Sequence, residues 1–161
     1  MAHKLLLSFI LTLSLAAWAK KHALDITVNL TPAGSFQVQA DKVKGKLTKK
    51  GDGYVAKKLF VKAAKLYTGI DLRDEHMLKR IESKKHKNIV VSNVIAKGGK
   101  GAGKITIKGI TKKIKFTYKV SGKQMLAKFK LNLAEFKIKD LTYLGVGAKD
   151  IIKVAAIVPI K

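Results

Sequence analysis

The chain has 161 residues, no cysteine and a formal net charge of +24 at neutral pH. This length accommodates one ordinary domain with a substantial core but not a second one, and the lack of cysteine excludes disulfides and lipid-modified cysteines. Arg73 and Arg80 are the only arginines, so lysine carries nearly all of the positive charge. Lysine lacks the planar fork that arginine offers to bases and phosphates. We therefore expect a lysine-coated exterior and no specific nucleic-acid partner.

Residues 1–19 differ in character from the rest of the chain. Lys4 precedes an apolar run over residues 5–15, and Ala17-Trp18-Ala19 ends in an A-x-A pattern. This pattern predicts a cleavable secretory signal peptide, because a run of about eleven residues is too short for a membrane-spanning helix, which needs roughly 20. We expect cleavage near Ala19, a single domain over residues 20–161, and a periplasmic or secreted protein.

Apolar and polar residues alternate after this leader, which predicts strands with one buried face. The alternation covers residues 24–30 and, after the turn signal Thr31-Pro32-Ala33-Gly34, residues 36–40. It resumes over residues 43–47 and, beyond a glycine-rich turn, over residues 55–63. Each pair of segments is expected to form an antiparallel hairpin.

Residues 71–82 depart from this period and are expected to form one short helix. Asp71 is suited to cap the helix, and Asp74 and Glu75 suit its positive N-terminal end. Strands are then expected again, with lysines on their outer faces, over residues 89–96, 105–107, 114–120, 125–133 and 151–160.

About eight strands and one helix fit either a sandwich of two sheets or a closed barrel. Periodicity does not choose between these architectures. The choice matters for function, because the interior of a barrel of about eight strands is either just filled by side chains or holds one small ligand.

Motifs for catalysis or cofactor binding fail on their chemistry. Residues 98–104 imitate a phosphate-binding loop, but Ile105 stands where a hydroxyl would reach magnesium, and a strand follows where a helix should begin. The ionisable cluster at residues 71–76 has no second histidine at a ligand spacing. No cysteine or serine elbow supplies a nucleophile. We expect no enzyme activity, no metal and no cofactor.

Four segments carry a resemblance to a known family, in the right order along the chain. They are residues 43–47 (VKGKL), 68–77 (TGIDLRDEHM), 103–112 (GKITIKGITK) and 134–138 (AEFKI). These segments are similar to the V-x-G-x-F strand, the TG…RDxHL signature, the G-x-LTIHGVTK hairpin and the D-F-G-I turn of the YceI-like polyisoprenoid-binding family. Lys108 and Lys137 replace the usual histidine and glycine of that family.

The resemblance implies a lipocalin-like antiparallel β-barrel that is exported. It also implies an isoprenoid chain, such as a polyprenyl phosphate or a quinone, held inside for carriage or sequestration. The expected partner is thus an isoprenoid or other long-chain lipid, with peripheral contact to an anionic membrane surface. The inward faces of the strands supply the candidate ligand-binding wall: Ile26, Val28, Phe36, Val38, Leu59, Val61, Ile105, Ile107, Phe116, Tyr118, Met125, Phe129 and Leu131. A polar mouth for the head group is expected at Tyr67, Arg73 and His76.

A second interpretation stays open from the sequence. In it, the barrel is filled, and the lysines bind anionic lipid, polysaccharide or nucleic acid at the surface. Salt separates the two interpretations, because binding by lysines weakens steeply with ionic strength whereas binding in an apolar interior does not. The sequence does not decide the oligomeric state.

Overall fold

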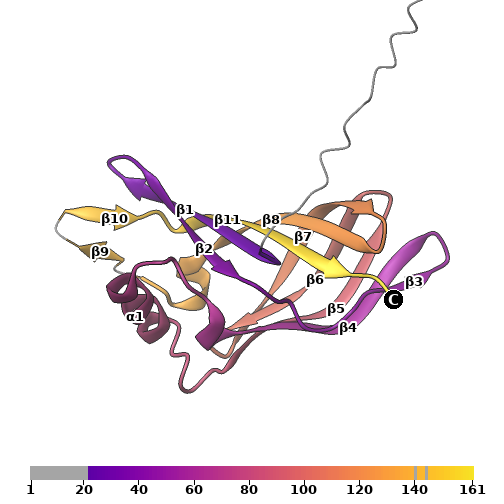
Figure 1. Cartoon of the computed structure of the whole chain (residues 1–161), viewed down its shortest axis with the longest axis horizontal. Helices are drawn as coiled ribbons and strands as arrows, with labels where there is room; N and C mark the ends of the chain where they lie inside the picture. The colour runs from indigo at the N-terminus through magenta and orange to yellow at the C-terminus, as the bar shows by residue number, and fades with distance from the viewer. Residues whose placement is uncertain (1–21, 140, 144) are drawn as a thin grey trace, which may run out of the picture.

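The computed structural model describes residues 22–139, 141–143 and 145–161, so the expected signal peptide lies outside the described residues. The described chain consists mainly of strands, with one α-helix at one end (Figure 1). The strands are β1 (Leu24–Thr31), β2 (Ser35–Ala40), β3 (Thr48–Lys50), β4 (Gly53–Lys62), β5 (Asn88–Lys97), β6 (Lys100–Ile107), β7 (Ile110–Ser121), β8 (Gln124–Asn132), β9 (Thr142–Tyr143), β10 (Val146–Ala148) and β11 (Ile151–Pro159). The helices are α1 (Asp71–Arg80) and two single turns of 3-10 helix, η1 (Ala63–Lys65) and η2 (Leu133–Phe136).

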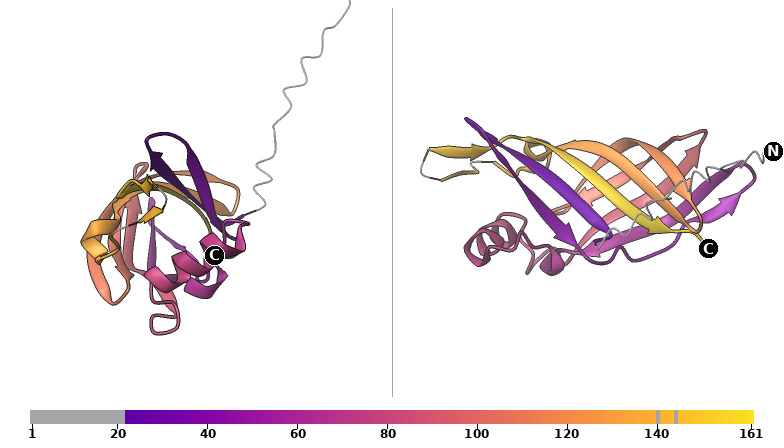
Figure 2. Two further views of the ribbon diagram at one scale, coloured as in Figure 1. Left: turned by 90° about the vertical axis from the view of Figure 1, so that its left-hand side faces the viewer. Right: turned by 45° about the horizontal axis from the view of Figure 1, so that its top comes forward.

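These strands form one curled antiparallel sheet. Strands β3 to β8 are neighbours in chain order, β11 lies between β8 and β1, and β1 pairs with β2, β10 and β11. The two sides of the curled sheet meet at a seam between the β2 region and the β4 region. Isolated bridges join this seam, in which Gln39 pairs with Tyr67 and Lys44 with Phe60 through backbone hydrogen bonds of 2.8–3.0 Å. The curled sheet encloses the core when viewed along its axis (Figure 2, left). The predicted all-β antiparallel barrel with one short helix is confirmed.

The strand count differs from the prediction of about eight, since eleven strands occur in the described part of the chain. The additional strands β3, β9 and β10 have only two or three residues each. The predicted strand over residues 43–47 is wrong, because this segment crosses the seam and makes only isolated bridges at Lys44 and Leu47. Strand β6 also begins earlier than expected, at Lys100, inside the glycine-rich segment.

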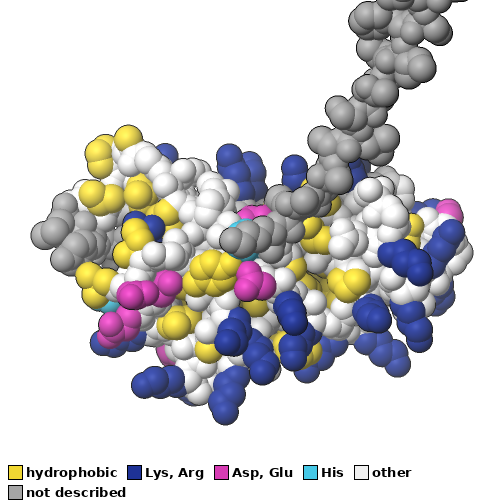
Figure 3. All heavy atoms as spheres, in the orientation of Figure 1, with side chains coloured by type: hydrophobic (Ala, Val, Ile, Leu, Met, Phe, Trp, Pro, Cys, Tyr) yellow, Lys and Arg dark blue, Asp and Glu magenta, His cyan; other side chains and the backbone are white. Residues whose placement is uncertain are grey.

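The alternation of side chains follows the pleat of the strands. In β7, Ile114 and Phe116 are buried while Lys113 and Lys115 are exposed. Leu126 breaks the alternation of β8 and is nevertheless buried, opposite Ile157 of β11 in the sheet. Most of the dark blue Lys and Arg side chains in Figure 3 lie away from the end where α1 and the β1–β2 hairpin project.

Helix α1 lies at the edge of one end of the barrel (Figure 2), and none of its residues is fully buried. The prediction that Asp71 caps it is wrong: the cap position is Ile70, which makes no side-chain cap hydrogen bond. Instead, Asp74 Oδ1 accepts hydrogen bonds from the backbone N–H and the hydroxyl of Thr68, at 2.7 and 2.6 Å. These bonds fix the turn before α1.

Candidate functional site: an apolar cavity in the barrel

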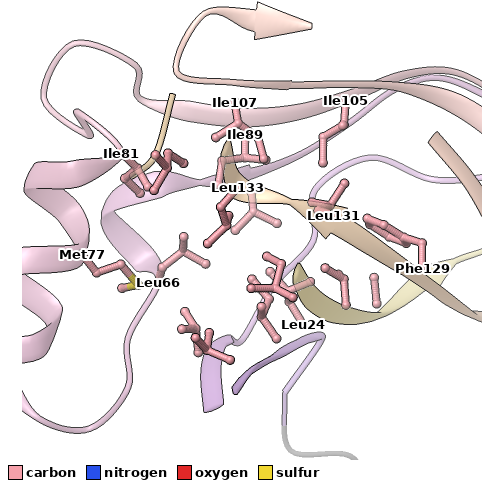
Figure 4. Close-up of a pocket in the computed structure, with 18 of the residues that line it drawn as sticks. Leu24, Leu66, Met77, Ile81, Ile89, Ile105, Ile107, Phe129, Leu131 and Leu133 are labelled. Carbon is pink, nitrogen blue, oxygen red and sulfur yellow. The ribbon is translucent and has the colours of Figure 1, made fainter. Parts of the chain in front are cut away.

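A cavity of about 600 Å³ lies inside the barrel. Its wall is formed by inward side chains of β1, β2, β4 to β8 and β11, together with one side of α1. Figure 4 shows side chains such as Ile105, Leu131 and Phe129 directed into this space. The polar side chains that line it, within the described part of the chain, are Arg73, His76, Arg80 and Thr142. Such a volume and composition are typical of sites for small apolar molecules.

One end of the cavity is closed by a packed cluster. Leu47 is fully buried and Met125 is 1% exposed, and both line the cavity next to the ring of Phe116. Gly101 lies directly against that ring, so that a methyl group at this position would overlap it. The glycine-rich segment thus has a packing role, because it lets Phe116 close the floor of the cavity.

The other end is open. The exposed residues of the cavity lining are His76 and Arg80 of α1 and Thr142 and Val146 of the β9–β10 hairpin. Both elements lie at the same end of the barrel (Figures 1 and 2). The opening is therefore between α1 and the β9–β10 hairpin. Ile70 and Leu72, at the start of α1, are exposed apolar side chains at this same end.

The helix presents basic side chains at this opening. Arg73, His76, Met77 and Arg80 follow the spacing i, i+3, i+4 and i+7, which places them on one side of the helix, and all four line the cavity. The guanidinium carbon of Arg73 lies 4.3 Å from the centre of the Phe36 ring, a cation–π contact. Arg80 Nη1 donates to the carbonyl of Lys139 at 3.4 Å.

Lys108 contacts the segment that follows the C-terminal end of α1. This side chain lies in the β6–β7 turn, and its Nζ is 3.1 Å from Glu82 Oε1 and donates to the carbonyl of Lys137 at 3.2 Å. The hydrogen bond from Lys108 is the main cause of a lowered pKa of Glu82, with further lowering by the charges of Lys108, Lys85 and His86. The lysine thus links the end of α1, the β6–β7 turn and η2 electrostatically.

Twelve of the thirteen residues expected to form the wall are brought together around this one cavity. These are Ile26, Val28, Phe36, Val38, Leu59, Val61, Ile105, Ile107, Phe116, Met125, Phe129 and Leu131. Tyr118 points to the same side of β7 as Phe116 but is not part of the lining. It packs against Tyr54, with ring centres 6.1 Å apart, in the cluster that closes the barrel. Whether the twelve residues contact a ligand stays a prediction.

Of the expected mouth residues, Arg73 and His76 lie at the opening, but Tyr67 does not line the cavity. Its hydroxyl donates to Asp41 Oδ1 at 2.8 Å and lies 2.8 Å from His22 Nδ1. The hydrogen bond to Asp41 is the main cause of a raised pKa of Tyr67. Tyr67 therefore belongs to the seam between β2 and β4, where its backbone pairs with Gln39.

Sequence reasoning missed Arg80 and the β9–β10 hairpin. Arg80 could have been found, because it lies two helical turns after Arg73 and shares its side of α1. The β9–β10 hairpin could not be predicted from the alternation of apolar and polar residues, because its two strands have only two and three residues. No group of three His, Asp or Glu side chains in the described chain forms a metal site. Over the same residues, none of the helices has the length and apolar character needed to cross a membrane.

The fold and the site define an antiparallel β-barrel with an apolar internal cavity that opens beside a helix. A model of the YceI-like domain family matches residues 15–160. The chain belongs to this family, as its sequence motifs predicted. A comparison with curated proteins found no match.

Solved structures share the fold at low sequence identity. BcnA of Burkholderia cenocepacia is 14% identical, with a TM-score of 0.59, over 83% of this chain and 94% of that one. A domain from Saccharophagus degradans, described as polyisoprenoid binding, is 12% identical, with a TM-score of 0.57, over 83% and 90%. The YceI protein of Campylobacter jejuni is 16% identical, with a TM-score of 0.51, over 74% and 83%. These similarities establish the barrel fold.

Proposed function

We propose that the protein is an exported, non-enzymatic carrier that holds one isoprenoid or similar long-chain lipid in the barrel cavity. The observation that carries this proposal is the almost wholly apolar wall of a cavity of about 600 Å³ that opens beside α1. The description of the Saccharophagus domain as polyisoprenoid binding supports the choice of ligand class. In this arrangement the tail lies along the wall and the head lies at Arg73 and His76.

Burial of the tail supplies enough free energy without specific polar contacts. Each buried methylene contributes about 0.8 kcal/mol, so an isoprene unit of five carbons contributes up to about 4 kcal/mol before the cost of ordering the chain. A few units therefore suffice for tight binding. The branched and aromatic side chains of the wall, such as Ile105, Val38 and Phe129, offer an irregular surface that suits a methyl-branched chain.

Purification with the native lipid tests this proposal. The protein is expressed from its full reading frame in a host with a cell envelope, washed at high salt to remove lipid held by lysines, and extracted with organic solvent. Mass spectrometry is expected to identify one isoprenoid-type lipid at about one molecule per chain. A folded protein that is empty and does not take up added geranylgeranyl phosphate would overturn the proposal. The mass of the protein tests export in the same experiment, since cleavage near Ala19 removes residues 1–19.

A second function is favoured by a separate observation, the exposed lysines on the outer faces of strands such as β7. With a net charge of +24, the barrel is attracted to anionic surfaces, by about 1 kcal/mol for each lysine near an anionic leaflet. Peripheral contact with an anionic membrane is compatible with lipid carriage. Sedimentation with phosphatidylglycerol vesicles at low and moderate salt measures this contact, which should weaken as salt rises, whereas the cavity-bound lipid should stay.

A further inference from the structure

We propose that the opening selects lipids with an anionic head, a phosphate or a carboxylate, over lipids with a neutral head. The inference rests on the proposed function and specifies the ligand further. The chain has 34 lysines and arginines, of which only Arg73 and Arg80 are arginines. Both arginines line the cavity, and no lysine of the described chain does so. The two types of cation are thus separated in space, with lysine on the outer surface and arginine at the opening.

This separation matters because arginine and lysine recognise anions differently. A guanidinium group presents several N–H donors in a plane that matches the oxygens of a carboxylate or phosphate, whereas an ammonium group is a hydrated point charge. The apolar wall beside the half-buried Arg73 also lowers the local dielectric constant there, which strengthens the attraction of this arginine for an anion. A lipid whose tail fills the cavity brings its head to this position.

The packing of α1 holds these donors in place. Arg73 is half-buried, and its guanidinium carbon lies over the Phe36 ring, 4.3 Å from the ring centre. Arg80 is seven residues further along, about 10 Å along the helix axis at 1.5 Å per residue, and His76 lies between them on the same side. Figure 4 shows Met77 of α1 and Ile81, the residue that follows the helix, directed into the pocket, which places this side of the helix over the ligand space.

No Asp or Glu of the described chain is among the residues that line the cavity. Asp74 is turned toward Thr68, from which it accepts two hydrogen bonds. Asp71 and Glu75 are exposed and lie on other sides of α1. The part of the helix that faces the ligand space is therefore basic, although the helix as a whole carries both charges.

The test uses three lipids with the same tail: geranylgeranyl phosphate, geranylgeranoic acid and geranylgeraniol. Their affinities are measured by titration calorimetry at moderate salt, with the delipidated protein as purified from the host with a cell envelope. We expect the two anionic lipids to bind about tenfold to a hundredfold more tightly than the alcohol, the range expected for charge-assisted hydrogen bonds. Arg73→Gln and Arg80→Gln should each remove a large part of this preference. Lys79→Gln, which removes an exposed charge next to Arg80 but outside the cavity lining, should leave it unchanged.

The outcomes separate this inference from the proposed function. If none of the three lipids binds, lipid carriage itself is wrong. If all three bind equally, or if Lys79→Gln reduces the preference as much as the arginine variants do, lipid carriage stands and head selection at the opening is overturned. Arg73→Lys, which keeps the charge but not the planar fork, is expected to retain only part of the preference. Circular dichroism checks that each variant is folded, and the comparison of lipids on the unmodified protein decides the inference even if Arg73→Gln does not fold.

Discussion

Two alanines flank Leu24 in the sheet and differ in what surrounds them. Ala40 of β2 and Ala156 of β11 both pair with Leu24 of β1, one on each side. Ala156 lines the cavity, whereas Ala40 is completely buried and is not among the residues that line the cavity. Replacing each alanine by leucine therefore measures, with a matched control, whether the barrel interior has free space.

The expected magnitudes follow from the added atoms. Leucine adds three carbons, so filling existing space could raise the free energy of unfolding by up to about 2 kcal/mol, at about 0.8 kcal/mol for each carbon. The same atoms forced into a packed core cost about 1–3 kcal/mol. We expect Ala156→Leu to leave the stability of the lipid-free protein unchanged or higher, and Ala40→Leu to lower it by about 1–3 kcal/mol.

Urea unfolding of the delipidated proteins, followed by far-UV circular dichroism, gives both values. A second measurement uses the same samples: Ala156→Leu should weaken the binding of geranylgeranyl phosphate, because the added atoms occupy space that the tail needs. If Ala156→Leu destabilises the protein as much as Ala40→Leu does, the interior is filled and the argument for a cavity fails.

Three further predictions concern the framework of the site. Lys137 has a left-handed backbone, with φ of 54°, so Lys137→Gly should raise the free energy of unfolding by roughly 1 kcal/mol in urea denaturation; a loss of stability would contradict this. Gly101→Ala places a methyl group against the Phe116 ring and should cost about 1–3 kcal/mol in the same assay, an effect that a neutral result would exclude. Lys108→Met should return the pKa of Glu82 toward its ordinary value of 4.5 in an NMR titration. Because the folded pKa is lowered, the stabilisation by this pair is present above pH 4.5 and lost as the pH falls through the lower folded value, so the stability gap between the two proteins should shrink on acidification.

The sequence indicated which side chains face the barrel interior, because alternation in a strand is a strong local signal. Phe116 and Ile114 face inward between lysines, and the same rule placed Phe129 and Leu131 correctly at the cavity. Alternation tells on which side of the sheet a side chain lies, but it does not tell at which position along the barrel axis. Tyr118 was misplaced for this reason, since it points inward at the level where the interior is packed.

Local sequence patterns did not show that the sheet closes into a barrel. The choice between a sandwich and a barrel depends on contacts between distant segments, such as the pairing of Lys44 with Phe60 and of Gln39 with Tyr67 across the seam. The resemblance to the family supplied this information where periodicity could not. The helix boundary shows the same limit, because Asp71 fits the preference for a cap, yet the turn is held instead by the pairing of Asp74 with Thr68.

The position of the packed cluster around Leu47 and Met125 has a consequence for the rate of exchange. A lipid bound with its tail toward this closed end leaves by the path through which it entered, so the whole tail must pass the opening before the molecule is free. If each isoprene unit contributes about 4 kcal/mol to the barrier for escape into water, spontaneous release slows by about a thousandfold for each unit. Such a lipid leaves quickly only when a second apolar environment is brought against α1 and the β9–β10 hairpin. If the protein carries a lipid as proposed, the closed floor makes slow release into water and rapid transfer on contact two results of the same geometry.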